Sequence, residues 1–190
     1  TSNNEIKVIK GIMSASKVRS VAKEKGVTIT VFLTSLLIYS IYLESFRYNP
    51  NNKSIDVCIP VNLRNFFKSD TSRNFFTSIA AGVNFYNKEL SFDEIISLVS
   101  EEFSKSLTKE NLYSMVKFGV DVQNKMFLRF LPIFIKNIGL KIAFAKGEKG
   151  YSCVLSNLGK ITLPKEYSAY VERFEVLISP TLNNHFKTSV

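Results

Sequence analysis

Apolar positions recur along this chain with two different periods, which predicts a mixture of helices and strands. Spacings of three and four residues predict amphipathic helices over 14–25 and 91–107, each preceded by a serine that can cap its first turn. Between them, 27–43 is apolar on nearly every side, and about 15 residues is short for a membrane span, which needs roughly 20. We therefore expect a buried central helix that is capped by Thr28 or Thr30.

Apolar residues in alternation predict strands over 55–61, 77–86, 151–157 and 172–178. Pro60 indicates that the first strand ends there or lies at a sheet edge, because proline has no N–H for a ladder hydrogen bond. The second strand contains the small residues Ala80, Ala81 and Gly82, which allow another group to approach the backbone closely. Strands that alternate with helices predict an α/β fold with at least partly parallel pairing, in two layers: a mixed β-sheet with helices on one face.

Two more helices are predicted over 110–126 and 127–145, the second one bent at Pro132. At about 100° per residue, one side of 125–145 is apolar and the other basic. The apolar side has Phe127, Phe130, Phe134, Ile138 and Ala145, and the basic side has Lys125, Arg129 and Lys136. We expect this helix to pack over a sheet or against another lobe; the alternative is a non-enzymatic module that binds a membrane or a protein through 125–145.

The composition suits one medium-sized domain, since 45% of the 190 residues are hydrophobic. The first residue is Thr, so the chain is expected to be cut from a longer protein. The net charge of +9 is spread along the chain, which is typical of a solvated basic surface, although an anionic partner could also account for it. Cys58 and Cys153 lie in apolar runs, which predicts buried free thiols and a cytoplasmic location.

The sequence holds little catalytic chemistry of its own. Its single histidine, His185, is close to the end of the chain, and the two cysteines lack metal-binding spacing, so a metal site is not expected. A GxSxG elbow, a P-loop and a GxGxxG fingerprint are all absent, and no pattern supports nucleic-acid binding. The pairs Asp93/Glu94 and Glu101/Glu102 are typical of solvated helix faces. From its residues alone, the chain is a binding or structural half without a catalyst.

One turn stands out at the end of the third predicted strand, in "VLSNLGKI". Gly159 can adopt the backbone conformation that such a turn requires. Ser156 and Asn157 can either shape the turn through their own hydrogen bonds or present donors to a ligand, and the residues leave both interpretations open.

The order of motifs resembles the C-terminal half of the chloramphenicol acetyltransferase-like superfamily. The segments that carry the resemblance are "VRSVAKEKGVTITVFLTSLLIYSIYL", then "IPVNLRNFF", then "TSRNFF", and finally "VLSNLGKI", over roughly residues 11–180. The superfamily includes condensation domains of peptide synthetases, plant acyltransferases, polyketide-associated acyltransferases and alcohol acetyltransferases. The "TSRNFF" form is most similar to the alcohol acetyltransferase branch.

The resemblance implies that residues 1–190 form the single C-terminal lobe of a two-lobed acyltransferase. In such enzymes a tunnel between the lobes admits the thioester of coenzyme A, or of a carrier protein, from one face and an alcohol or amine from the other. The general base is a histidine of an HHxxxDG motif in the N-terminal lobe. This sequence has no such motif, so the chain is expected to be inactive alone. Acyl-CoA is then a co-substrate, with no covalently bound cofactor.

The resemblance also implies roles for individual residues. Ser156 and Asn157 would line the tunnel, Gly159 would shape the turn, and Arg64 would hold the lobe together through carboxylates or carbonyls. Asn84 would match an asparagine that condensation domains place near the base. Plant members carry DFGWG where this chain has SNLGKI, so the aspartate of their structural ion pair is missing here. The expected partner is the N-terminal lobe, with peripheral membrane contact or a dimer through the exposed lobe interface as further possibilities.

Overall fold

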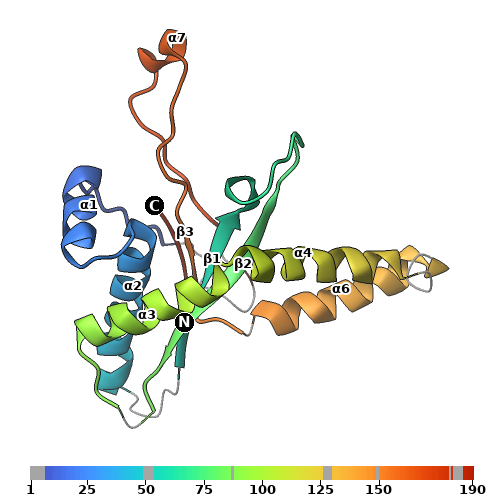
Figure 1. The fold of residues 1–190 in the computed structure, drawn as a ribbon, viewed down its shortest axis with the longest axis horizontal. Coiled ribbons are helices and arrows are strands. Elements are labelled where there is room, and N and C mark those ends of the chain that lie inside the picture. Colours follow the sequence, from blue (N-terminus) through green and yellow to red (C-terminus); the bar gives the residue numbers. More distant parts are fainter. Residues whose placement is uncertain are drawn as a thin grey trace.

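A computed structural model describes residues 7–48, 54–86, 88–125, 130–148, 150–179, 181 and 186–190. Figure 1 shows a sheet with helices α1 to α3 gathered at one side, while α4 and α6 extend away from it as an arm and α7 lies at the end of a long excursion. Four strands form the sheet in the order β2-β1-β3-β4. The predicted α/β fold with a mixed sheet is therefore confirmed.

The sheet has β1 (Ser54–Asn62) at its centre. β1 pairs antiparallel with β2 (Phe76–Asn84) along its whole length and parallel with the short β3 (Cys153–Ser156) at Val57 and Cys58. β4 (Lys187–Ser189) pairs parallel with β3. The predicted strands over 55–61, 77–86 and 151–157 thus correspond to β1, β2 and β3.

One face of the sheet forms the core. Its alternating residues are fully buried and pack with α2 (Ile29–Tyr48) and α3 (Phe92–Ser106); they include Ile55, Val57, Ile59, Ile79, Ala81, Val83, Cys153 and Leu155. Ser78, Ala80 and other residues of the opposite face stay accessible. This one-sided burial is the two-layer arrangement that the sequence predicted. Both cysteines are free and buried, again as predicted.

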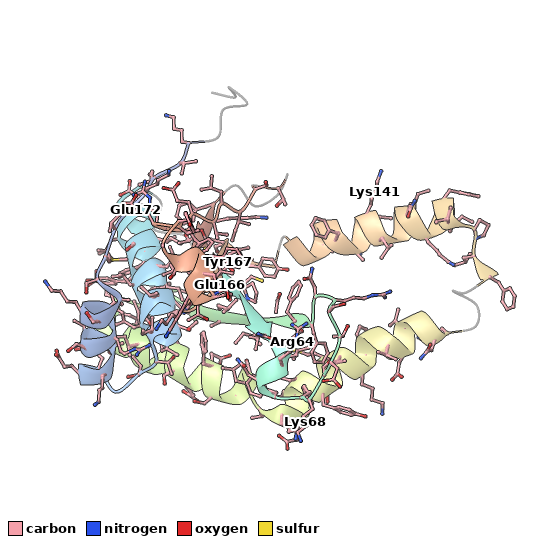
Figure 2. The ribbon with its side chains drawn as sticks, turned by 90° about the horizontal axis from the view of Figure 1, so that it is seen from above. Arg64, Lys68, Lys141, Glu166, Tyr167 and Glu172 are labelled. Carbon is pink, nitrogen blue, oxygen red and sulfur yellow. The ribbon has the colours of Figure 1, made fainter. Side chains whose placement is uncertain are left out.

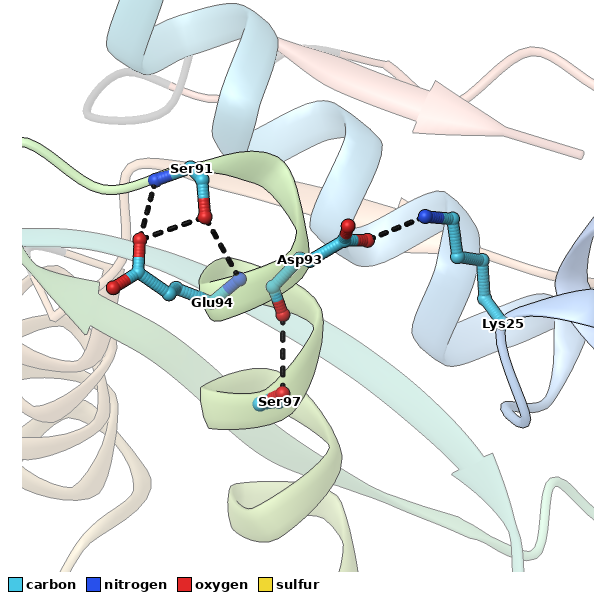
Figure 3. A network of polar contacts seen from close by, with 5 residues as sticks. All are labelled: Lys25, Ser91, Asp93, Glu94 and Ser97. Atoms are coloured by element: carbon cyan, nitrogen blue, oxygen red, sulfur yellow. Dashed lines mark hydrogen bonds and ion pairs between the residues drawn. The ribbon is translucent and has the colours of Figure 1, made fainter.

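Local capping signals set the helix ends. Ser14 caps α1 (Ala15–Glu24), and Gly26, with φ of 71°, follows its last turn. Ser91 and Glu94 form a reciprocal capping box at the start of α3, shown in Figure 3. Lys25 at the end of α1 forms an ion pair of 2.6 Å with Asp93 in the first turn of α3.

Among the described residues, no single helix is long and apolar enough to cross a membrane, although α1 and the first part of α2 pass that test together, with a bend of 86° between them. α2 buries Val31, Leu33 and Ile38 in the core. Its position agrees with the central helix predicted over 27–43.

Pro60 lies inside β1 and does not end it. Ser152 N–H donates to the Asp56 carbonyl, so residues 56, 58 and 60 direct their backbone polar groups toward β3. The missing N–H of Pro60 therefore falls on the β3 side, and the ladder to β2 continues to Asn62. The parallel pairing with β3 ends at Cys58, just before the proline. Of the two alternatives expected for Pro60, a strand end is wrong, whereas an edge position is correct on the β3 side, where β1 has no partner at this residue among the described strands.

Another group approaches the backbone closely at Gly82, as the small residues of the second strand predicted. It lies opposite Asp56 in the β1–β2 register. A Cβ on Gly82 would be 1.9 Å from Asp56 Oδ1, so the space of the missing side chain is filled by the carboxylate. The group that passes near Gly82 thus belongs to the protein's own neighbouring strand.

The arm consists of α4 (Lys109–Asn124) and α6 (Ile133–Glu148). α6 begins directly after Pro132, so the proline starts a helix where a bend was expected. Lys136, Lys141 and Lys146 follow one another at intervals of five residues and therefore fall on three different sides of α6. Apolar residues also occur on every side of α6, so the helix lacks the separate basic and apolar faces that the sequence predicted. Phe127 and Arg129 lie outside the described residues.

The strand predicted over 172–178 is wrong. These residues have no regular secondary structure and are exposed except for the half-buried Ile178. The edge of β3 that they could have occupied is taken by β4. Figure 1 shows the intervening chain leaving β3, turning through α7 (Lys165–Ser168) and coming back to the sheet. β4, which the sequence did not predict, pairs with β3 instead.

Candidate functional site

The turn that follows β3 is built around Asn157. The side-chain carbonyl of Asn157 accepts a hydrogen bond of 2.9 Å from Gly159 N–H, which closes an Asx turn. Gly159 has φ of 68°, a conformation that other residues rarely adopt. Of the two interpretations that the sequence left open for Asn157, the turn-shaping one is thus present in the structure.

The same side chain also joins the turn to α2. Asn157 Nδ2 donates a hydrogen bond of 3.1 Å to Thr30 Oγ1 in the first turn of the helix. Thr28, which directly precedes α2, caps the helix: its Oγ1 accepts from Val31 N–H at 3.3 Å, and the Thr30 hydroxyl oxygen accepts from Asn157. The amide of Asn157 is therefore fixed at both ends, beside the positive end of a helix dipole.

Ser156 is the last residue of β3 and is half-buried. Its backbone carbonyl accepts from Val190 N–H at 2.9 Å, which holds the end of the chain against the turn. Within the part of the chain that the structure describes, the Ser156 hydroxyl makes no hydrogen bond. A hydroxyl and an oriented amide thus lie next to each other at the carboxyl end of β3.

Arg64 lies beyond the carboxyl end of β1, in the short helix η1 (Leu63–Asn65). Its guanidinium donates to the carbonyl oxygens of Thr71 (2.9 Å) and Arg73 (2.7 Å) and so closes the loop between β1 and β2. These are carbonyl contacts of the kind expected for this residue. Figure 2 shows Arg64 and Lys68 on this loop, which also contains Arg73.

Asn84 lies at the other end of the sheet. It is the last residue of β2 and pairs with Ser54, the first residue of β1. Cys58 of β1 pairs with Val154, so Ser156, two residues further along β3, lies at the level of Pro60. From Ser54 to Pro60, β1 rises by about 20 Å. Asn84 also accepts a hydrogen bond of 2.9 Å from Tyr86 N–H through its side chain, in an Asx turn of its own. The structure brings Ser156, Asn157 and Gly159 together and leaves Asn84 apart from them.

The buried cysteines do not supply a nucleophile. Burial raises the pKa of the Cys153 thiol to about 12, and burial also raises the pKa of Cys58 despite hydrogen bonds from Ser78 and Tyr151. Thiols with raised pKa values are neutral at pH 7 and react poorly. Among the described residues there is no group of three or more metal-ligating side chains. His185 lies outside the described residues.

The arrangement can therefore orient a ligand but contains no base of its own among the described residues. The carboxyl ends of parallel strands are a common place for ligands in α/β folds, and here the first turn of α2 adds a partial positive charge. The sequence indicated Ser156, Asn157 and Gly159, but it missed their link to Thr30. That bond joins residues 127 positions apart, and only the proposal of a threonine cap near residue 28 pointed to this part of α2.

A family model described as alcohol acetyltransferase matches residues 2–176. Because the match extends over most of the chain, the protein belongs to the alcohol acetyltransferase family, the branch that the "TSRNFF" motif indicated. No curated protein matches the sequence. Among solved structures, the crystal structure of vinorine synthase is similar at 12% identity with a TM-score of 0.45. The similarity covers 77% of this chain and 31% of that one, so this chain spans about a third of the length of that structure.

Proposed function

We propose that this chain is the C-terminal lobe of an acyl-CoA-dependent alcohol acyltransferase and forms one wall of its substrate tunnel. The observation that carries the proposal is the family match over residues 2–176. In the reaction, the hydroxyl oxygen of the acceptor forms a bond to the thioester carbonyl carbon, and the C–S bond then breaks. The acceptor proton passes to a base and finally to the departing coenzyme A thiolate.

The base in this proposal is a histidine of another lobe. The chain contains no HHxxxDG motif, and its single histidine is His185. The contribution of this lobe is positioning: Asn157 uses one amide hydrogen for Thr30, and the second is directed from a side chain that is already fixed. A donor that needs no reorganisation is well suited to bind the carbonyl oxygen of a thioester.

The basic surface supports the choice of coenzyme A as the acyl carrier. Exposed basic residues lie at the same end of the sheet as Asn157. They are in the segment between β1 and β2 (Arg64, Lys68 and Arg73) and just after the Asn157 turn (Lys160). Exposed positive charges at the mouth of a site attract the phosphates of coenzyme A, and such attraction weakens as salt screens it. The KM for acetyl-CoA is therefore expected to rise with ionic strength, and a salt-independent KM would contradict this part of the proposal.

The test uses the full-length protein with acetyl-CoA and a series of primary alcohols, with release of the coenzyme A thiol and ester formation both measured. We expect turnover by the full-length protein and none by residues 1–190 alone. Asn157→Ala is expected to lower kcat/KM by about 10- to 100-fold through loss of one positioned donor. Turnover by residues 1–190 alone would contradict the assignment of the base to another lobe.

Asn84→Ala is the matched control. It removes the same type of side chain from the same type of turn, but at the opposite end of the sheet. We expect kcat/KM to remain within about twofold of the original value. If both variants lose activity equally, the position of Asn157 at the end of β3 has no special role in catalysis. Thermal melting of both variants shows whether such a loss comes from reduced stability.

A further inference from the structure

The arm leaves an unusual amount of apolar surface uncovered. No described side chain of α6 is buried. Its exposed residues, with those just before it, include Phe130 (83% exposed), Ile133 (75%), Phe134, Ile135, Ile138, Leu140, Ile142 and Phe144. Across the arm, α4 adds Phe118 at 73%. An apolar patch of this extent marks a surface that is covered in the working protein.

This surface surrounds the helix on every side. At about 100° per residue, Ile133, Leu140 and Phe144 fall on one side of α6, Phe134 and Ile138 on a second, and Ile135 and Ile142 on a third. A folded partner with one flat face would cover only one of these sides. A fluid apolar medium covers them all, and a helix that is apolar all round needs such a surrounding.

The charged residues of α6 before its final residue, Glu148, are all lysines. Lys136, Lys141 and Lys146 interrupt its apolar residues, and the sequence from Phe130 to Gly147 contains no aspartate or glutamate. Figure 2 shows Lys141 projecting from α6. Long lysine side chains can keep their stems among apolar groups and extend their ammonium groups to anionic headgroups.

We propose that the two helices of the arm, α4 and α6, dock this protein on a membrane that contains anionic lipids. The arm extends away from the sheet, so it can enter one leaflet while β3 and the strands beside it stay outside (Figure 1). α6 has 16 residues and is about 24 Å long, less than the roughly 30 Å of a bilayer core. It is therefore too short to cross the bilayer and embeds in one leaflet, where acyl chains can reach its apolar sides and the lysine ammonium groups can reach the headgroups.

The test is co-sedimentation of the full-length protein with two kinds of vesicle, one of phosphatidylcholine alone and one that also contains about 30 mol% phosphatidylserine to supply anionic headgroups. We expect binding to the anionic vesicles that weakens in high salt. F130E/F134E should reduce the bound fraction at least fivefold, and K141E/K146E should reduce it on anionic vesicles only. Acyl transfer from acetyl-CoA to a water-soluble alcohol should be unchanged in both variants.

Y167E/Y170E is the matched control, because it places the same charge on two exposed aromatic residues of the other projection, at α7. It should bind vesicles as the original protein does. Failure of the original protein to bind anionic vesicles would overturn the proposal, and so would an equal loss in the α7 variant. A dimer in light scattering that F130E/F134E dissociates, without any change in vesicle binding, would assign the arm to a second copy of the chain and overturn it as well.

Discussion

Asn157 in the turn after β3 donates a hydrogen bond to Thr30 in the first turn of α2, although 127 positions separate the two residues. The bond joins the second structural layer to the end of the parallel strand pair. It also fixes which way the amide of Asn157 points, because the opposite end of the amide accepts from Gly159 N–H. The stability of the turn and the orientation of the donor are thus properties of one side chain.

A double-mutant cycle measures this link. Thr30→Val should lower the free energy of unfolding by about 1 kcal/mol, since it removes one partly buried hydrogen bond, and Asn157→Ala should lower it by about 2 kcal/mol, since it also removes the bond from Gly159 N–H. The double variant should lose less than the sum, with a coupling of about 0.5–1 kcal/mol in urea unfolding. Strict additivity would mean that the bond contributes nothing to stability in solution.

Gly82→Ala tests the close approach of Asp56. The added methyl group would overlap the carboxylate, whose nearest oxygen is 1.9 Å from the Cβ position, so the free energy of unfolding should fall by about 1–3 kcal/mol. Asp56→Ala should restore part of that loss when combined with it. Gly119→Ala is the control: nothing lies within 4 Å of its Cβ position in α4, so the same substitution there should stabilise by up to about 1 kcal/mol.

Thr34→Val should raise stability. Thr34 is completely buried in α2, and among the described residues its hydroxyl has no hydrogen-bond partner. Valine has the same shape without a polar atom to desolvate, so the melting temperature should rise by an amount that corresponds to about 1 kcal/mol. The neighbouring Ser35 is equally buried but donates to the Val31 carbonyl at 2.9 Å, and Ser35→Ala should not stabilise. A lower melting temperature for Thr34→Val would reveal a partner for the hydroxyl.

Cys153 predicts how stability changes at alkaline pH. In the unfolded chain the thiol loses its proton near pH 9, whereas in the folded protein its pKa is about 12. Between these values the unfolded state releases a proton that the folded state keeps, so the free energy of unfolding falls as pH rises. The slope is about 1.4 kcal/mol per pH unit, with the full stability retained below pH 9.

Urea unfolding between pH 8 and 10.5 measures that slope, with Cys153→Ala as the reference. Lysines and tyrosines titrate in the same range, and the difference between the two proteins isolates the thiol. The original protein should lose stability more steeply than the variant above pH 9. Parallel curves would mean that the thiol ionises as readily in the folded state as in the unfolded one.

The sequence predicted best those elements whose signals are local. The serine caps of α1 and α3 and the alternation in β1 and β2 identified these elements nearly to their ends. The strand at 172–178 failed because alternation shows only that a segment could pair, whereas β3 has one remaining edge and β4 occupies it. Which of two segments takes a single edge depends on tertiary pairing.

In the candidate site, too, the sequence predicted what depends on local signals and missed what depends on tertiary packing. The residues Ser156, Asn157 and Gly159 form a contiguous turn, and a turn can be predicted from its own composition. The separation of Asn84 from that turn depends on the antiparallel register that places Asn84 opposite Ser54, and the residues around Asn84 contain no sign of that register. The link to Thr30 depends in the same way on how α2 packs over the sheet.

Pro60 makes β1 a branching point of the sheet. Up to Cys58 the strand is held on both sides, and from Pro60 onward it is held by β2 alone, so that β1 and β2 can continue as a two-stranded ribbon while the chain after β3 takes another path. A residue with an N–H at this position could extend the pairing with β3 and draw the following turn toward β1. The chain after Ser156 thus separates from β1 next to a residue that has no N–H to donate, and Asn157 bonds to Thr30 of α2 instead.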